Sequence, residues 1–322
     1  MTPADRPTRG LHHVTAIAGP AQENLDFYSG VLGMRLVKKS VNQDDPGTYH
    51  FFYADAEGRP GTDLTFFPWS HLAPARRGHG LAQETALAVA PGSLDFWSGR
   101  LERYGARLGK LERRFGDRVL TLEDPHGLAL ALVESASAAA RPFTPWENGP
   151  VPGEHQIRGL DGARLLLRAV GPTERYLEQG LGYRLLGEEN GWRRWGVDGG
   201  GSGARLELAE DPASPRGAWG TGAVHHLAFR AVDEAHQLEL RAAAAERHPT
   251  PVIDRFWFRS VYFREPGGVL FELATDGPGF AVDEAPERLG ESLVLPPWLE
   301  PQRAEIEAQL PALRPVTARG TA

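Results

Sequence analysis

One short pattern recurs four times along the chain and limits the folds open to it more than any other feature. In its two clearest copies, Glu123–Val133 and Arg264–Leu273, an acidic residue, a proline and a glycine lead into an apolar strand. Proline presets φ for a turn, and glycine supplies the permissive conformation that ends it. Weaker copies, built on Arg-Pro-Gly and Gly-Ser-Gly, precede the apolar segments 63–67 and 204–208. The last glycines of these turns are Gly61, Gly127, Gly203 and Gly268, at spacings of 66, 76 and 65 residues, which indicates a repeated structural unit.

Each interval holds the same predicted order of elements. A short apolar strand comes first, at Leu11–Ile17, Thr85–Ala90, Ala163–Val170 and Val224–Val232. A helix follows, at Gln22–Leu32, Ser93–Tyr104, Thr173–Gln179 and Asp233–Arg247. The remaining length accommodates three strands. The sequence therefore predicts an α+β fold in which four βαβββ modules form two paired-module domains with cupped mixed β-sheets.

The composition of the connecting segments predicts the domain boundaries. Residues 141–155 are rich in proline and glycine and form a predicted linker between two domains. Each domain, 1–140 and 156–280, holds two modules. A C-terminal tail, 281–322, contains Pro-Pro-Trp and a short amphipathic helix near Gln302–Leu310, and we expect it to pack over one domain.

Charge and cysteine content exclude several functional classes. The 35 basic and 42 acidic residues give a net charge of −7, which argues against nucleic acid as the main partner. The sequence has no long apolar run for a membrane span and no apolar core of a secretory signal, so we expect a cytoplasmic protein. Without cysteine there is no disulfide, thiolate metal site or cysteine nucleophile. A metal would be held by His, Asp, Glu or Tyr, which suits Fe(II) or Mn(II).

The modules differ at a few polar positions, and these differences indicate a site. The last strand of the fourth module carries Glu272 where the second module has alanine, and its first strand carries His226 where the second has threonine. The first module carries a histidine pair, His12 and His13, at the matching place. A carboxylate inside an apolar strand is costly unless it is paired, and a solvent-facing position or a salt bridge is the alternative. If the first and fourth modules pair, these side chains form a facial triad of two histidines and one carboxylate.

Strand alternation bears on which histidine of each pair is the ligand. Side chains alternate between the two faces of a strand, so neighbours point in opposite directions. The face of His226 also carries Ala228, which leaves room for a ligand, and this favours His226 and, by analogy, His13 over His12 and His225. The third module has Glu207 at the place of Glu272 but no histidine on its first strand, so we expect no second metal site there.

Several stretches together resemble a known family. They are LHHVTAI, FYSGVLGMRLVKKSVNQDD, TYHFFYAD, RPGTDLTFFPW, EHQIRG, AVHHLAF, FRSVYFREPGGVLFELATD and GFAVDE, and they span nearly the whole chain. They are similar to the vicinal-oxygen-chelate superfamily of glyoxalases and extradiol dioxygenases, and more closely to its hydroquinone-cleaving dioxygenases. The resemblance implies Fe(II), with Mn(II) as the alternative, bound by His13, His226 and Glu272.

The resemblance also implies roles for residues around the metal. It makes His12, His225, Tyr262 and Arg255 catalytic candidates, with His225 as an acid or base, and Thr15 a substrate-binding position. Arg259 competes with Arg255 for its role, and His50 lies in a strand that could line the same cup. For each of these residues a purely structural role, in the core or in a surface ion pair, is the alternative.

The expected function is that of a non-haem Fe(II)-dependent, extradiol-type ring-cleaving dioxygenase that acts on a hydroquinone or catechol-like diol. The expected partners are a small aromatic diol and O₂, with no nucleic acid and no membrane, and the oligomeric state is left open. Two alternatives remain. A glyoxalase-like isomerase or lyase would typically use a second carboxylate, where this chain has Thr65, and a binding protein for aromatics or quinones would need no metal triad.

Overall fold

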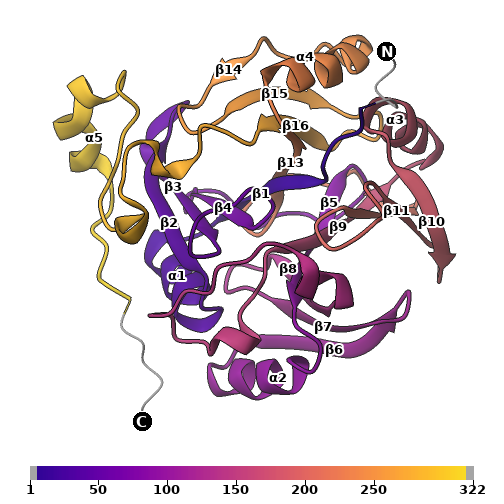
Figure 1. Ribbon diagram of the computed structural model, residues 1–322, viewed down its shortest axis with the longest axis horizontal. Coiled ribbons are helices and arrows are strands. Elements are labelled where there is room, and N and C mark those ends of the chain that lie inside the picture. The colour runs from indigo at the N-terminus through magenta and orange to yellow at the C-terminus, as the bar shows by residue number, and fades with distance from the viewer. Residues whose placement is uncertain (1–5, 317–322) are drawn as a thin grey trace.

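The computed structural model describes residues 6–316 and contains four βαβββ modules in chain order, which confirms the predicted fold (Figure 1). The first comprises β1 (Leu11–Ala18), α1 (Ala21–Leu25), a π-helical continuation (Asp26–Val31), β2 (Arg35–Asn42), β3 (Asp45–Ala54) and β4 (Asp63–Pro68). The second comprises β5 (Leu81–Val89), α2 (Leu94–Arg103), β6 (Arg107–Arg114), β7 (Asp117–Glu123) and β8 (Ala129–Glu134). The third comprises β9 (Leu160–Leu167), α3 (Gly171–Leu181), β10 (Arg184–Glu189), β11 (Trp192–Gly196) and β12 (Arg205–Glu210). The fourth comprises β13 (Val224–Ala231), α4 (Glu234–Ala243), β14 (Ile253–Asp254), β15 (Arg259–Arg264) and β16 (Leu270–Thr275).

Short helices make up the rest of the regular structure. The 3₁₀ turns are Ala136–Ala140, Gly153–His155, Ala245–Arg247, Phe280–Val282, Pro286–Arg288 and Glu300–Gln302, and the last helix is α5 (Arg303–Gln309). Within residues 6–316 no helix combines the length and the apolar character that crossing a membrane requires.

The modules pair across the chain into two eight-stranded sheets. The first sheet has the order β14-β15-β16-β13-β1-β4-β3-β2 and joins the fourth module to the first. The second has the order β10-β11-β12-β9-β5-β8-β7-β6 and joins the third module to the second. In each sheet the first strands of two modules run antiparallel, while each first strand is parallel to the last strand of its own module. Each sheet thus takes one module from either side of residues 141–155, and the division into sequence domains stays a prediction.

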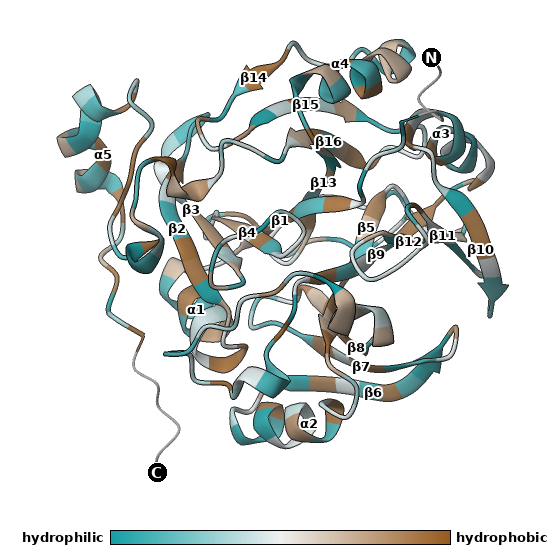
Figure 2. Ribbon diagram, viewed as in Figure 1, coloured by the Kyte–Doolittle hydropathy of each residue, from teal (hydrophilic) through white to brown (hydrophobic). Residues whose placement is uncertain are grey.

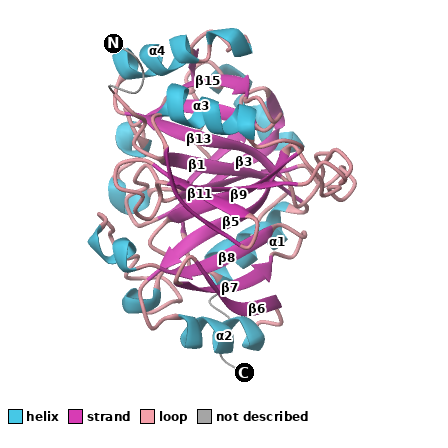
Figure 3. Cartoon of the chain, turned by 90° about the vertical axis from the view of Figure 1, so that its right-hand side faces the viewer, coloured by secondary structure: helices cyan, strands magenta, loops and turns pink. Residues whose placement is uncertain are grey.

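The helices pack on the outside of the sheets through apolar side chains at helical spacing (Figure 3). In α2 the residues Leu94, Trp97 and Leu101 are buried, with exposures of 1% or less. Burial of one such side chain contributes about 1.5–3 kcal/mol to stability. Hydrophobic residues recur along the strands of both sheets, whereas α4 and α5 carry many hydrophilic residues (Figure 2). The helices therefore cover the convex sides and leave the concave sides for polar chemistry.

The described part of the tail, residues 277–316, packs over the outer strands of the first module (Figure 1). Val294 donates its N–H to the carbonyl of Lys39 in β2, and Ile306 of α5 joins an apolar cluster with Val41. Lys38 is fully buried, and its ammonium contacts the carboxylates of two tail residues, Asp283 and Glu284. The tail is thus fixed to the sheet that holds the site described next.

Candidate metal centre

Three side chains from neighbouring strands of the first sheet converge on its concave side. His13 on β1, His226 on β13 and Glu272 on β16 have exposures of 2%, 3% and 0%. The Nε2 atoms of the two histidines are 3.1 Å apart. Glu272 Oε2 lies 3.2 Å from the Nε2 of His13 and 2.9 Å from that of His226. The sheet order β16-β13-β1 places these residues side by side, although His13 and Glu272 are 259 positions apart in the sequence.

These donor spacings fit one face of an octahedron. A cation about 2.1 Å from each donor, with right angles between the bonds, separates the donors by about 3.0 Å. Tetrahedral coordination at the same bond length would separate them by about 3.4 Å. Two histidines and one carboxylate on one octahedral face are the ligand set that non-haem Fe(II) oxygenases use, and it leaves positions open for other ligands.

Glu272 presents one carboxylate oxygen to this centre and uses the other for support. Its Oε1 accepts a hydrogen bond from Ser260 Oγ, whereas Oε2 is buried without a hydrogen-bond partner of its own. Burial by itself raises the pKa of this carboxyl, but the charges of His13 and His226 hold the pKa well below its usual value. The donor set therefore offers one negative charge and an unsatisfied oxygen, as a divalent cation requires.

The two neighbouring histidines lie behind the ligands rather than on the opposite face. His12 Nδ1 is 2.9 Å from His13 Nδ1, and His225 Nδ1 is 2.8 Å from His226 Nδ1. Strict alternation would forbid this contact, but the register between β1 and β13 skips one residue at His12 and one at His225. Such bulges turn an extra side chain toward its neighbour. Each ligand histidine thus has its Nδ1 occupied, which leaves its Nε2 for the cation.

Burial keeps the supporting histidines neutral. It lowers the pKa of His12 well below its usual value, and the charge of His13 adds to the effect. Burial, with the charge of His226, lowers the pKa of His225 to about 3. A neutral ring with one free nitrogen can accept the Nδ1–H of its neighbour, so these histidines orient the ligands.

A cavity of about 390 Å³, including its open mouth, leads to the metal ligands. Its walls combine aromatic rings with a few polar groups. They are His13, Asn42, Gln43, Asp44, His50, Phe52, Phe67, His226, Arg255, Trp257, Phe258 and Tyr262. Aromatic walls with a few convergent polar groups are typical of sites that bind small molecules.

The structure brings three further predicted residues to this cavity. Tyr262 is the register partner of Glu272 on β15, and its ring centre lies 5.6 Å from that of His226. The guanidinium of Arg255 lies 5.6 Å from the Tyr262 ring centre. His50 stands on β3 and contacts the cavity from the other side.

Two other predicted residues lie outside the cavity lining. Thr15 is fully buried, and its Oγ1 lies 2.7 Å from Thr65 Oγ1, which in turn lies 3.0 Å from His50 Nε2. It therefore reaches the cavity only through Thr65. The side chain of Arg259 is 43% exposed and forms an ion pair with Glu234 on α4, so the structure does not bring it to the site.

Sequence reasoning missed the support of the carboxylate and one wall of the cavity. Ser260, which donates to Glu272, has the same strand parity as Tyr262, and that parity was the available signal. Phe258 packs against both His12 and His13, with ring centres 5.3 Å apart in each case. The position of Phe258 against these two rings depends on an irregular segment between β14 and β15, which no local sequence pattern predicts.

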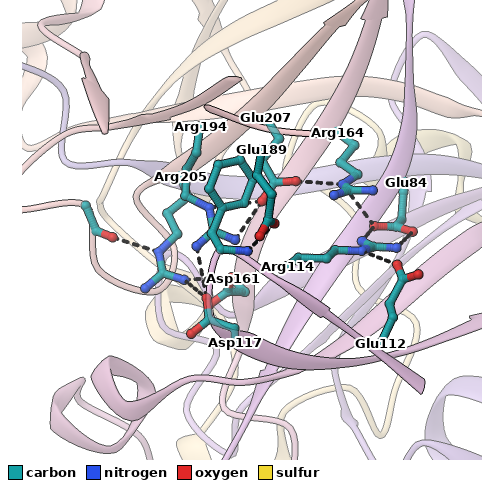
Figure 4. Close-up of polar contacts among 12 residues, drawn as sticks. Glu84, Glu112, Arg114, Asp117, Asp161, Arg164, Glu189, Arg194, Arg205 and Glu207 are labelled. Carbon is teal, nitrogen blue, oxygen red and sulfur yellow. Dashed lines mark hydrogen bonds and ion pairs between the residues drawn. The ribbon is translucent and has the colours of Figure 1, made fainter. Parts of the chain in front are cut away.

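The second sheet holds an arginine–carboxylate network in place of a metal triad (Figure 4). Glu207 on β12 stands where the first sheet has Glu272, and it accepts hydrogen bonds from Arg164 and Arg194. Arg194 is the register partner of Glu207, as Tyr262 is of Glu272. In this cup the counter-charge of the carboxylate is therefore supplied by the protein itself.

Comparison with known proteins places this geometry in a family. The family model described as the Glyoxalase/Bleomycin resistance protein/Dioxygenase superfamily matches residues 10–132 and 170–273. A protein of Bacillus subtilis (strain 168) named "Putative ring-cleaving dioxygenase MhqO" is 44% identical over 305 residues, which cover 94% of this chain and 96% of that protein. The "Chlorohydroquinone/hydroquinone 1,2-dioxygenase" of Sphingobium indicum is 31% identical over 305 residues, which cover 92% of this chain and 94% of that enzyme.

A solved structure agrees with these relatives. The crystal structure of a protein described as a "putative dioxygenase" from Bacillus subtilis superimposes with a TM-score of 0.88 at 42% identity, over 97% of this chain and 99% of that one. The sequence relatives and the solved structure thus agree over almost the full length of the chain, and the family model matches two ranges within it. The protein belongs to the glyoxalase, bleomycin resistance protein and dioxygenase superfamily, and within it to the class of ring-cleaving dioxygenases.

Proposed function

We propose that the protein is a non-haem Fe(II)-dependent dioxygenase of the extradiol type that cleaves the ring of a hydroquinone-like aromatic diol with O₂, with Mn(II) as the alternative metal. The observation that carries the proposal is the facial arrangement of His13, His226 and Glu272 beside a cavity lined by aromatic side chains. The name of the Sphingobium relative supports hydroquinone over catechol. A cysteine-free chain with a ferrous site suits the reducing cytoplasm, where we place the reaction.

The metal would be held by the two Nε2 atoms and by Oε2 of Glu272. When bound, it supplies Lewis acidity that favours the ionised form of a diol hydroxyl and a path for electrons from the ring to O₂. In the overall reaction the C–C bond beside one hydroxyl-bearing carbon breaks, and both oxygen atoms of O₂ enter the product. The protein contributes position, exclusion of water and control of protons.

The aromatic walls would hold the ring over the metal ligands. Phe52, Trp257 and Phe258 are buried and belong to one apolar cluster on the tail side of the cavity. They exclude water from the reacting face, which strengthens the electrostatic interactions there. An aromatic substrate gains from stacked or edge contacts with these rings.

Polar groups would act on the substrate oxygens. Burial raises the pKa of Tyr262, so its hydroxyl keeps its proton and can donate to the ionised substrate oxygen. Arg255 supplies positive charge beside it. On the opposite wall His50, connected through Thr65 to Thr15, would bind the second hydroxyl.

His12 and His225 act through the ligands in this proposal. Both contact the Nδ1 atom of a ligand histidine, and neither lines the cavity. We therefore propose them as positioning residues that fix the rings of His13 and His226, rather than as groups that touch the substrate.

Oxygen uptake tests the proposal directly. The protein would be reconstituted anaerobically with Fe(II), or separately with Mn(II), and mixed with O₂ and hydroquinone, catechol or a methylglyoxal–thiol adduct. Uptake with the diols, and loss of uptake in Glu272→Gln, is the expected result. Turnover of the thiol adduct without O₂ would instead support an isomerase, and ring binding without any turnover would support a binding protein.

A further inference from the structure

One side of the cavity mouth is formed by a contact between the two edges of the first sheet. β2 and β14 are the outermost strands on opposite sides of this sheet. The turn after β2, residues 42–45, and the segment after β14, residues 254–258, nevertheless meet, because the sheet curls into a cup. We call this contact, made by Asn42, Gln43, Asp44 and Arg255, the rim clamp.

Side chains of the turn hold both the charge and the backbone of Arg255. The carboxylate of Asp44 accepts two hydrogen bonds from its guanidinium, at 3.1 and 2.7 Å. Gln43 Nε2 donates to the carbonyl of Arg255 at 2.9 Å. Asn42 Oδ1 accepts the N–H of Asp44 at 2.9 Å, which orients the turn. Paired bonds of this geometry between guanidinium and carboxylate are among the stronger polar contacts in proteins.

The segment that the clamp holds forms a wall of the cavity. Phe256 has a φ of +73°, a left-handed conformation that is unfavourable for a residue with a side chain. Asp254 supports it by accepting the N–H of Phe256 at 2.8 Å. The next two residues, Trp257 and Phe258, line the cavity. The clamp therefore fixes the wall as well as the charge at the mouth.

The charges at the mouth bear on which rings can enter. The side chain of Arg255 is 15% exposed and lies at the cavity, whereas that of Asp44 is 73% exposed and lies at its outer rim. The remaining polar groups of this rim, Asn42 and Gln43, carry amides without charge. A carboxylate on an entering ring would meet the negative charge of Asp44 and an arginine that is already paired.

We propose that Asp44 is a specificity-determining residue that restricts the cavity to aromatic diols without an anionic substituent. By pairing with Arg255 it offsets, at the mouth, the positive charge that would otherwise attract a carboxylate on the ring. Loss of its charge frees the guanidinium to bind a carboxylate-bearing diol. The assignment of diols as the ligand class rests on the proposed function, whereas the discrimination against negative charge rests on the clamp.

Binding measurements without turnover test this proposal. Calorimetry under anaerobic conditions would compare hydroquinone with 2,5-dihydroxybenzoate, on the metal-free protein and again after loading with Fe(II). The variants are Asp44→Asn, which removes the charge, and Asp44→Glu, which retains it. The matched control is Glu234→Gln, which removes an exposed partner of Arg259 away from the cavity.

We expect Asp44→Asn to improve the affinity for the carboxylate-bearing ring relative to hydroquinone by about tenfold or more, as partly buried charge pairs allow. Asp44→Glu and Glu234→Gln should have the same ratio of affinities for the two rings as the unaltered protein. Gln43→Ala loosens the clamp but leaves the ion pair of Asp44 in place, so this affinity ratio should also stay unchanged. An unchanged ratio in Asp44→Asn would overturn the proposal, as would the same shift in Gln43→Ala or failure of both rings to bind the unaltered protein. Absence of O₂ uptake with every diol would refute the proposed function alone, because the affinity ratio is measured without turnover.

Discussion

The repeated fold offers a paired test of the metal centre, because Glu272 and Glu207 occupy equivalent places in the two cups. Glu272 faces two histidines, and Glu207 faces two arginines. The same change, glutamate to glutamine, should therefore have opposite consequences at the two positions. At Glu272 it should remove metal binding, and at Glu207 it should lower stability and leave metal binding intact.

The magnitudes follow from what each carboxylate contacts. Removal of one partner from a buried charge pair costs about 3–5 kcal/mol. For Glu272→Gln this cost falls on the bound state, so the Kd for the metal should rise by roughly 10²- to 5 × 10³-fold. The metal-free protein also loses the contacts of this carboxylate with His13 and His226, so its stability should fall as well.

For Glu207→Gln the cost falls on folding. Arg194 keeps a bond to Asp117, and Arg164 keeps a more distant contact to Glu84, so the lower end of the range applies. A loss of about 3 kcal/mol should lower Tm by roughly 4 °C in a chain of this size.

Thermal unfolding with and without metal separates the two effects. At a free Fe(II) concentration of about one hundred times Kd, binding stabilises the native state by about 2.7 kcal/mol. The unaltered protein and Glu207→Gln should both show this gain in Tm, and Glu272→Gln should not. The assignment of the metal centre would be refuted if Glu272→Gln kept the full increase in Tm on addition of Fe(II). It would also be refuted if Glu207→Gln lost this increase while its Tm without metal equalled that of the unaltered protein.

Three further predictions concern stability and turnover. Burial holds the pKa values of His12, His50 and His225 below 6.5. Below that pH the unfolded state therefore binds more protons than the folded state, so the free energy of unfolding should fall as the pH drops from 6.5. For His225, whose pKa burial lowers to about 3, the loss is about 2–3 kcal/mol by pH 4.5, and urea unfolding of the metal-free protein at pH 6.5 and pH 4.5 would measure it. Lys38→Met leaves two carboxylates uncompensated and should cost about 3 kcal/mol, measured as a lower urea midpoint; an unchanged midpoint would show that the pair is dispensable. Tyr262→Phe should lower kcat about 10²-fold with little change in KM, and a raised KM with unchanged kcat would instead indicate a role in binding only.

The fold could be predicted from the sequence because the repeats carry strong local signals. The turn before Gly127 and the turn before Gly268 mark the same place in two modules, and the helix and strand patterns between them follow from periodicity. The ends of the elements shift by a few residues, as with β9, expected at Ala163–Val170 and found at Leu160–Leu167. Local patterns specify which elements form, but hydrogen bonding in the sheet decides where they end.

The three residues of the candidate metal centre could be picked out from the sequence because each is an exception to the apolar pattern of its strand. Their support could not, because it depends on the register between strands distant in sequence. The contact of His12 with His13 requires a bulge in β1, and sequence alternation alone would place the two rings on opposite faces. The pairing of Asp44 with Arg255 likewise depends on how strongly the sheet curls, which no local pattern encodes.

The two cups show how one scaffold can carry a reactive site and a structural one. A buried carboxylate at the end strand of a module needs a positive partner, whichever cup it occupies. In the second cup Arg164 and Arg194 meet this need permanently, so Glu207 has no free oxygen for a metal. In the first cup Tyr262 stands at the place of Arg194, Glu272 faces two histidines in place of two arginines, and its Oε2 stays without a hydrogen-bond partner. The first cup can therefore take a divalent cation because histidines, rather than arginines, stand beside the equivalent glutamate.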